Sequence, residues 1–188
     1  MKKLSLTLGI LLFAFASTFA QKISPDQSEV KWTGYKVTGQ HNGTVAVKGG
    51  ELKVKKGVVK EGTIVIDLTS LTSLDLQGEW QQKLDGHLKS ADFFDVEKHP
   101  TATFTLKEVA VDGDVHKLKG DLTIKGVTQE VAFDSKLKSE GKKHTLEGKL
   151  KIDRTKFGLK YGSDSFFDNL GDKAIADEFD IDFKVQTI

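Results

Sequence analysis

Short segments that alternate apolar and polar side chains recur along most of this chain. The clearest is the last one, where Phe179, Ile181 and Phe183 alternate with charged residues. Because successive side chains of a strand point to opposite faces, each such segment predicts a strand with one buried and one solvated face. Turn signals that contain glycine separate many of the segments. We therefore predict an all-β domain of eight antiparallel strands, at residues 29–37, 44–54, 58–68, 101–111, 117–125, 127–137, 145–153 and 178–187.

One segment, between residues 80 and 100, follows a different period. Five of its side chains recur every third or fourth residue, which places them on one face of a short helix; they are Trp80, Leu84, His87, Leu88 and Ala91. Phe93 and Phe94 come next, and Pro100 returns the chain to extended backbone. A single amphipathic helix in an all-β chain is expected to act as a plug or lid at one end.

Three sequence blocks resemble those of a known family. The first runs through His87-Leu88 and Phe93-Phe94-Asp95 to His99-Pro100 and Phe104. The second is the strand-turn-strand segment at 120–128, and the third is Asp-Arg-Thr-Lys-Phe-Gly at 153–158. In their order and spacing, over nearly the whole chain after about residue 22, these blocks are similar to those of the YceI-like family.

The resemblance implies a lipocalin-like, eight-stranded antiparallel barrel with one short helix inserted after the third strand. It also implies that the interior binds a long-chain isoprenoid lipid of the quinone or polyprenyl phosphate type. One departure concerns the first hairpin, where family members often carry Arg-His or Lys-His and this chain has Tyr35-Lys36-Val37. This hairpin is expected to turn at residues 41–43, because they contain the strong turn signal Asn-Gly.

The first 20 residues have the features of a secretory signal peptide. Lys2 and Lys3 precede an apolar run, and Ala20 ends a cleavage site of small residues. We predict cleavage after Ala20, a periplasmic or secreted location without stable membrane insertion, and one mature domain at residues 21–188. Loss of the two lysines changes the net charge from +1 to about −1, which argues against nucleic acid as a partner. Because the chain has no cysteine, disulfides do not contribute to its stability.

Two glycines, Gly120 and Gly148, fall at inward-facing positions between large apolar residues. Their missing side chains would leave a tubular space, and a barrel of eight strands is just wide enough for one slim ligand. Glycines in strands also occur at barrel corners and bulges, so the sequence leaves both interpretations open. The candidate ligand-binding residues come from these strands, the helix, the Phe pair and the long connection before the last strand; they are Trp80, Leu84, His87, Phe93, Phe94, Phe104, Gly120, Gly148, Phe157, Tyr161, Phe166 and Phe167.

Arg154 is the only arginine of the chain. Its planar guanidinium offers five donors in a fixed geometry that a lysine does not have. One interpretation is a structural ion pair with a carboxylate near Glu178 or Asp180. The other is contact with a polar or phosphate head group of a bound lipid.

The other candidates for chemistry do not form a recognisable site. The five histidines lack the spacing that would direct two imidazoles to one metal ion. Asp164, Asp168 and Asp172 do not fit the EF-hand pattern, and the sequence has no nucleophile elbow or P-loop. We therefore expect no metal, no catalysis, and no cofactor, with the isoprenoid lipid bound as a ligand.

The predicted function is to sequester or carry a long apolar lipid in the barrel interior. Two alternatives stay open. One is a filled barrel that acts as a stress-related structural or interaction module. The other is an enzyme acting on a hydrophobic small molecule, with His87 as acid or base. Both a monomer and a homodimer are compatible with the sequence.

Overall fold

The computed structural model describes residues 20–188, which contain nine strands and one α-helix. The strands are β1 (Gln21–Lys22), β2 (Glu29–Lys36), β3 (Gly39–Lys55), β4 (Val58–Ser73), β5 (Thr101–Asp112), β6 (Val115–Ile124), β7 (Val127–Glu140), β8 (Lys143–Asp153) and β9 (Ile175–Gln186). Helix α1 (Gly78–Lys89) follows β4, and the 3₁₀ turns are η1 (Pro25–Gln27), η2 (Arg154–Phe157) and η3 (Gly171–Lys173). Apart from Ala20, the predicted signal peptide lies outside the described residues.

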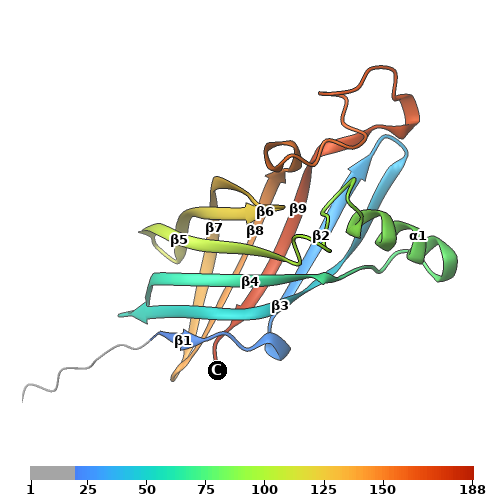
Figure 1. Ribbon diagram of the computed structural model, residues 1–188. Helices are drawn as coiled ribbons and strands as arrows, with labels where there is room; N and C mark the ends of the chain where they lie inside the picture. Colours follow the sequence, from blue (N-terminus) through green and yellow to red (C-terminus); the bar gives the residue numbers. More distant parts are fainter. Residues whose placement is uncertain (1–19) are drawn as a thin grey trace, which may run out of the picture.

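Strands β2 to β9 form one closed antiparallel barrel (Figure 1). Each of these strands pairs with the next in the chain, and β2 also pairs with β9, so the ring has no open edge. The predicted eight-stranded barrel, with its helix after the third of these strands, is confirmed. Strand β1 is an addition that pairs with β3 through Gln21 and Leu52. Its two residues are too few for an alternating pattern to predict it.

The prediction of an Asn-Gly turn at residues 41–43 is wrong. The chain turns at residues 37–38, and Gly43 pairs with Trp32 inside the β2–β3 ladder. A β-carbon at Gly43 would lie 1.9 Å from the carbonyl oxygen of Thr72 and 2.6 Å from the Trp32 ring. This glycine is therefore required by close packing in the sheet, and it gives the same sequence signal as a turn.

The interior of the barrel has two parts. In the half that lies away from α1, large apolar side chains such as Leu118, Leu146 and Val59 are almost completely buried and belong to the core. In the half near α1, inward side chains such as Leu122 and Leu150 surround a cavity. The barrel is therefore a packed core at one end and a hollow at the other.

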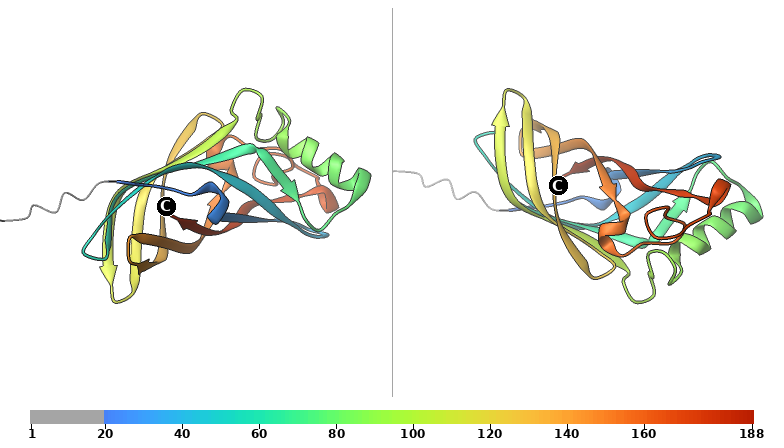
Figure 2. Two further views of the ribbon diagram at one scale, coloured as in Figure 1. Left: turned by 90° about the horizontal axis from the view of Figure 1, so that it is seen from below. Right: turned by 90° about the horizontal axis from the view of Figure 1, so that it is seen from above.

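Helix α1 and the connection between β8 and β9 lie at the same end of the barrel (Figure 2). They meet where the His87 ring on α1 contacts the Tyr161 ring in the connection, with ring centroids 4.5 Å apart. The β2–β3 turn joins them through a hydrogen bond from Val37 N to Ala174 O of 3.2 Å. We call this end, formed by α1, the connection 154–174 and the turn at 37–38, the mouth.

Candidate binding cavity

The mouth leads into a cavity of about 340 Å³ inside the barrel. Side chains from all eight barrel strands and from α1 line it, and most of them are apolar; examples are Trp32, Ile66, Ala102, Ile124, Leu150 and Ile181. Pockets for small molecules usually start at about 300 Å³, so the cavity is large enough to hold a ligand of modest size. Its apolar walls favour a ligand that leaves water on binding.

Helix α1 covers the mouth although none of its residues is buried. Two polar side chains attach it to the end of β4. The Asp85 carboxylate accepts hydrogen bonds from Thr72 Oγ1 at 2.8 Å and from the N and Oγ of Ser73 at 2.8 and 2.9 Å. Gln81 Nε2 donates to the carbonyl oxygen of Ser73 at 2.8 Å. Held in this way, the helix places Leu84 on the cavity wall.

Five of the twelve predicted ligand-binding residues line the cavity, namely Leu84, His87, Phe93, Phe94 and Phe104. Phe93 and Phe94 follow α1 in a turn that is closed by a hydrogen bond from Phe94 N to Leu88 O, at 3.0 Å. Both rings are buried, with centroids 5.3 Å apart. The helix and the Phe pair are thus brought together on the cavity, as the change of sequence period indicates.

The other aromatic candidates lie outside the cavity lining; they are Trp80, Phe157, Tyr161, Phe166 and Phe167. Phe157 is buried in the hydrophobic core. The other four are exposed at the mouth, with Trp80 69% exposed. Trp80 shares a helical face with Leu84, but it lies in the first turn of α1, which projects beyond the barrel (Figure 2). These five predicted ligand-binding residues therefore do not line the cavity.

Gly120 and Gly148 do not leave the tubular space that their position in the sequence predicts. A β-carbon at Gly120 would lie 2.8 Å from the Phe104 ring, and one at Gly148 would lie 2.8 Å from the Phe183 ring. Neighbouring aromatic rings thus fill the volume that the missing side chains would occupy. Neither glycine lines the cavity.

His87 is surrounded by aromatic rings. Its ring centroid lies 5.9 Å from that of Phe93 and 4.5 Å from that of Tyr161. Its Nε2 atom is buried and has no hydrogen-bond partner among the described residues. A general acid or base exchanges a proton with a bound substrate, so this packing by itself assigns His87 no catalytic role.

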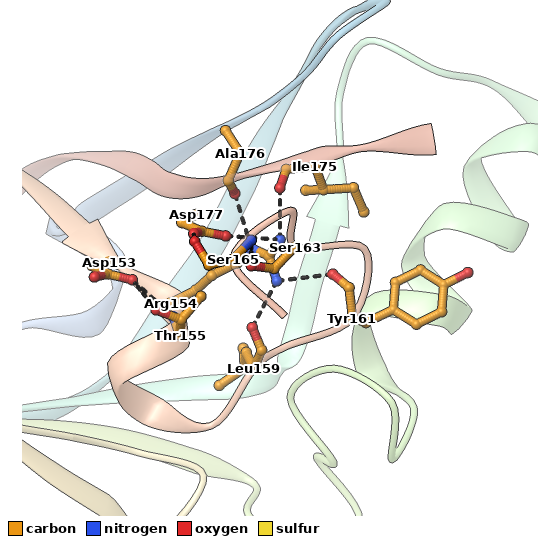
Figure 3. Close-up of polar contacts among 10 residues, drawn as sticks. All are labelled: Asp153, Arg154, Thr155, Leu159, Tyr161, Ser163, Ser165, Ile175, Ala176 and Asp177. Carbon is orange, nitrogen blue, oxygen red and sulfur yellow. Dashed lines mark hydrogen bonds and ion pairs between the residues drawn. The ribbon is translucent and has the colours of Figure 1, made fainter. Parts of the chain in front are cut away.

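Arg154 is engaged by the protein on all sides of its guanidinium group (Figure 3). Its nitrogens donate four hydrogen bonds of 2.6 to 2.9 Å to the carbonyl oxygens of Leu159, Tyr161, Ile175 and Ala176. Nη2 also faces an oxygen of Asp177 at 3.7 Å. The acidic partner is thus Asp177, while Glu178 and Asp180 lie near Lys151. Four of the five N–H donors of Arg154 are thus bound to backbone carbonyls, and the fifth, on Nη2, faces Asp177.

The pKa values of Arg154 and Asp177 are shifted by burial and by the groups around them, as expected for a structural ion pair. Burial lowers the pKa of Arg154, although Asp177 and Asp153 act in the opposite direction. Burial raises the pKa of Asp177, but hydrogen bonds from Ser163 and Ser165 and the charge of Arg154 together lower the pKa below its ordinary value. Asp177 is therefore ionised at neutral pH and opposes the arginine charge.

A few polar side chains line the cavity at the mouth. Lys36, His41 and Glu178 are among them. His41 Nδ1 lies 2.7 Å from Asp75, which also accepts a hydrogen bond from Asn42 N. Burial raises the pKa of Asp75, but these hydrogen bonds outweigh it and lower the pKa below its ordinary value. The mouth therefore offers charged groups to a ligand whose apolar part lies deeper.

Several cavity residues were not among the sequence candidates. Trp32, Ile64 and Phe133 all line the cavity. Each occupies an inward position of its strand, for example Trp32 two residues after the buried Val30. The alternating pattern that predicts the strands therefore also contains the signal for these positions.

The fold and its cavity define a class of protein, a closed antiparallel barrel with an apolar cavity beneath a helix. The model of the YceI-like domain matches residues 21–187, and the chain belongs to the YceI-like family. A UPF0312 protein of Photorhabdus laumondii is 32% identical over 146 residues, which cover 74% of this chain and 73% of that protein.

Other relatives match over shorter stretches. A UPF0312 protein of Pectobacterium atrosepticum is 53% identical over 57 residues, which cover 30% of each chain. Protein YceI of Escherichia coli O157:H7 is 42% identical over 82 residues, or 40% of this chain and 43% of that protein. The chain therefore aligns with less than half the length of these two relatives.

Two solved structures share the fold. The crystal structure of Burkholderia cenocepacia BcnA has a TM-score of 0.67 at 21% identity, covering 88% of this chain and 99% of that chain. A polyisoprenoid binding domain from Saccharophagus degradans has a TM-score of 0.68 at 16% identity, covering 89% and 97%. At these identities the similarity establishes the barrel architecture.

Two further observations apply to residues 20–188. No helix in this part of the chain combines the length and apolar character needed to cross a membrane. Within the same residues, no three His, Cys, Asp or Glu side chains lie together in a way that could hold a metal ion.

Proposed function

We propose that this protein binds the tail of an isoprenoid lipid in the barrel cavity and carries or sequesters it in the periplasm or outside the cell. The observation that carries the proposal is the cavity of about 340 Å³ with its mainly apolar lining. A filled barrel would lack this space. The polyisoprenoid binding domain of Saccharophagus degradans, which has the same fold, supports the choice of ligand class, and the predicted signal peptide supports the location.

The physical basis of binding is the removal of a hydrocarbon chain from water. Burial of one CH₂ group contributes about 0.8 kcal/mol, so a five-carbon isoprene unit contributes at most about 4 kcal/mol. Loss of translational freedom and ordering of the chain oppose this gain. Two buried units contribute at most about 8 kcal/mol before these costs are subtracted, and each further buried unit adds to this gain.

We further propose that the head group stays at the mouth. Arg154 also borders the cavity, but four of its five N–H donors are already bound to backbone carbonyls, so Lys36 and Glu178, which line the cavity at the mouth, are the proposed contacts. Both a quinone and a polyprenyl phosphate fit this arrangement, because the tail contributes most of the binding energy. The protein acts by binding alone in this proposal, without a chemical step.

Ala102→Phe tests the proposal by placing a ring inside the cavity. Ala102 is buried on β5, opposite Ile66, and lines the cavity. The added ring takes the space of about one isoprene unit, so the affinity for farnesol is expected to fall at least about tenfold. Titration of the purified protein with farnesol, followed by tryptophan fluorescence, measures this change.

Ala132→Phe is the matched control, because Ala132 is exposed on the outer face of β7. It is expected to bind farnesol as the native protein does. If Ala102→Phe folds and binds farnesol with native affinity, the ligand does not occupy the cavity and the proposed function is wrong.

A further inference from the structure

We infer that a layer of three phenylalanines, Phe104, Phe133 and Phe183, forms the floor of the cavity and limits the length of lipid tail that the protein can enclose. The inference rests on the proposed function and adds a chain-length specificity to it. The three rings line the cavity and come from three alternate strands of the barrel, β5, β7 and β9.

The three rings contact one another across the barrel. The Phe133 ring lies between the other two, with centroids 5.2 Å from Phe104 and 5.6 Å from Phe183. Strand pairing continues the layer to the opposite wall, since Phe104 pairs with Ile64 and Phe183 pairs with Val30. Tilted and edge-on contacts at these distances are favourable for aromatic rings, so the layer is a stable packing unit.

Two glycines seat this layer against the barrel wall. The Phe104 ring lies over Gly120, and the Phe183 ring lies over Gly148, each close enough that a β-carbon would come within 2.8 Å of the ring. The rings therefore lie against bare backbone and are held there by the strands around them. This explains why glycine occurs at two inward positions that do not border the cavity.

Beyond the layer the barrel is packed, and of the residues there Val185, two positions after Phe183 on β9, still borders the cavity. On β6 and β8, the inward residues on the far side are Leu118 and Leu146, each 1% exposed, and neither lines the cavity. His116 is also buried there, with its Nε2 atom 3.2 Å from the carbonyl oxygen of Gly57. A tail that enters from the mouth therefore meets the phenylalanine layer and cannot continue to the other end.

The cavity volume sets the expected limit. At about 30 Å³ for each water-sized group, 340 Å³ holds on the order of ten carbon positions, or about two isoprene units. A longer tail leaves its remaining units outside the mouth, where they gain little from binding. The affinity should therefore rise with chain length at first and then become constant.

A series of prenols of increasing length, from the one-unit 3-methylbut-2-en-1-ol through geraniol, farnesol and geranylgeraniol to solanesol, tests this limit. In a Trp80→Phe background, Trp32 on the cavity wall is the only tryptophan and reports occupancy by its fluorescence. Each added unit is expected to raise the affinity at least about tenfold while it still fits into the cavity, and less than about twofold beyond the limit. An affinity that rises by the larger factor through solanesol would contradict the inference.

Phe133→Ala is expected to move the limit to a tail longer by about one unit, because the phenyl group removed and an isoprene unit have nearly the same number of carbons. Phe133→Leu, which keeps more of the packing, provides the same test with a smaller shift if the alanine variant does not fold. Leu137→Ala is the matched control, since Leu137 lies on the same strand beyond the layer and does not line the cavity; its limit should be that of the native protein.

The results distinguish the two proposals. If no prenol binds to the native protein, the proposed function fails. If prenols bind and Ala102→Phe blocks them, but the folded Phe133 variants keep the native limit, the proposed function stands and the phenylalanine layer does not set the chain length.

Discussion

Replacement of Arg154 by leucine is expected to lower the free energy of unfolding by about 3–5 kcal/mol. The side chain is 2% exposed and donates to four carbonyl oxygens, two in the connection between β8 and β9 and two at the start of β9. Leucine would leave these oxygens, and the carboxylate of Asp177 at 3.7 Å, without their partner. The measurement is the urea concentration at the midpoint of unfolding. A lower midpoint with an unchanged dependence of the free energy on urea concentration reports the loss of stability directly.

Two variants separate the geometry of Arg154 from its charge. Arg154→Lys keeps the positive charge but cannot reach four carbonyl groups at once, so it should lose more than half of the stability that leucine loses. Lys151→Leu removes an exposed lysine of β8 that lies 3.6 Å from Glu178 and Asp180, and it should change stability by less than about 1 kcal/mol. If the Arg154→Leu variant unfolds at the same urea concentration as the native protein, the hydrogen bonds from Arg154 to the four carbonyl oxygens do not hold the connection in place.

Gly120→Leu is expected to have a comparable effect and to lower the free energy of unfolding by more than about 3 kcal/mol. Even a β-carbon at this position would lie 2.4 Å from the carbonyl oxygen of Thr105, and a longer side chain would also displace the Phe104 ring. The carbonyl oxygen belongs to the β5–β6 ladder and cannot move without disturbing the strand pairing. Thermal unfolding followed by circular dichroism measures the loss.

Gly86→Ala provides the control for replacement of a glycine. Gly86 lies in α1, and a β-carbon there would meet nothing within 4 Å. Because alanine favours the helix, this variant should be as stable as the native protein or more stable by about 0.5–1 kcal/mol. A Gly120→Leu variant that unfolds at the native temperature would mean that the position is open, as a tubular interior would require.

The sequence predicts the barrel well because its strands are long and two-faced. Alternation in a segment such as 178–187 has a physical cause, since one face meets the interior and the other meets water. The change of period between residues 80 and 100 likewise identifies α1 and the Phe pair, because helix and strand place their apolar residues at different spacings. These signals are local, and the structure retains them.

The contents of the barrel are harder to predict, because they depend on contacts between strands that are distant in sequence. Gly43 gives an Asn-Gly turn signal, but it is required because the Trp32 ring of the neighbouring strand lies too close to leave room for a β-carbon. Gly120 gives the signal of an empty position, but the Phe104 ring from β5 fills it. The arginine of the chain suggests a head-group site, whereas the connection that follows it supplies the carbonyl oxygens that it binds.

Lipid binding in the cavity is tested most directly by mass spectrometry of an organic extract from protein purified from the cell envelope without detergent. We expect an isoprenoid lipid in stoichiometric amount in the native protein, and a strongly reduced amount in the folded Ala102→Phe variant. A well-folded native sample whose extract contains no apolar ligand would contradict this expectation, and would indicate that the cavity is not a lipid site.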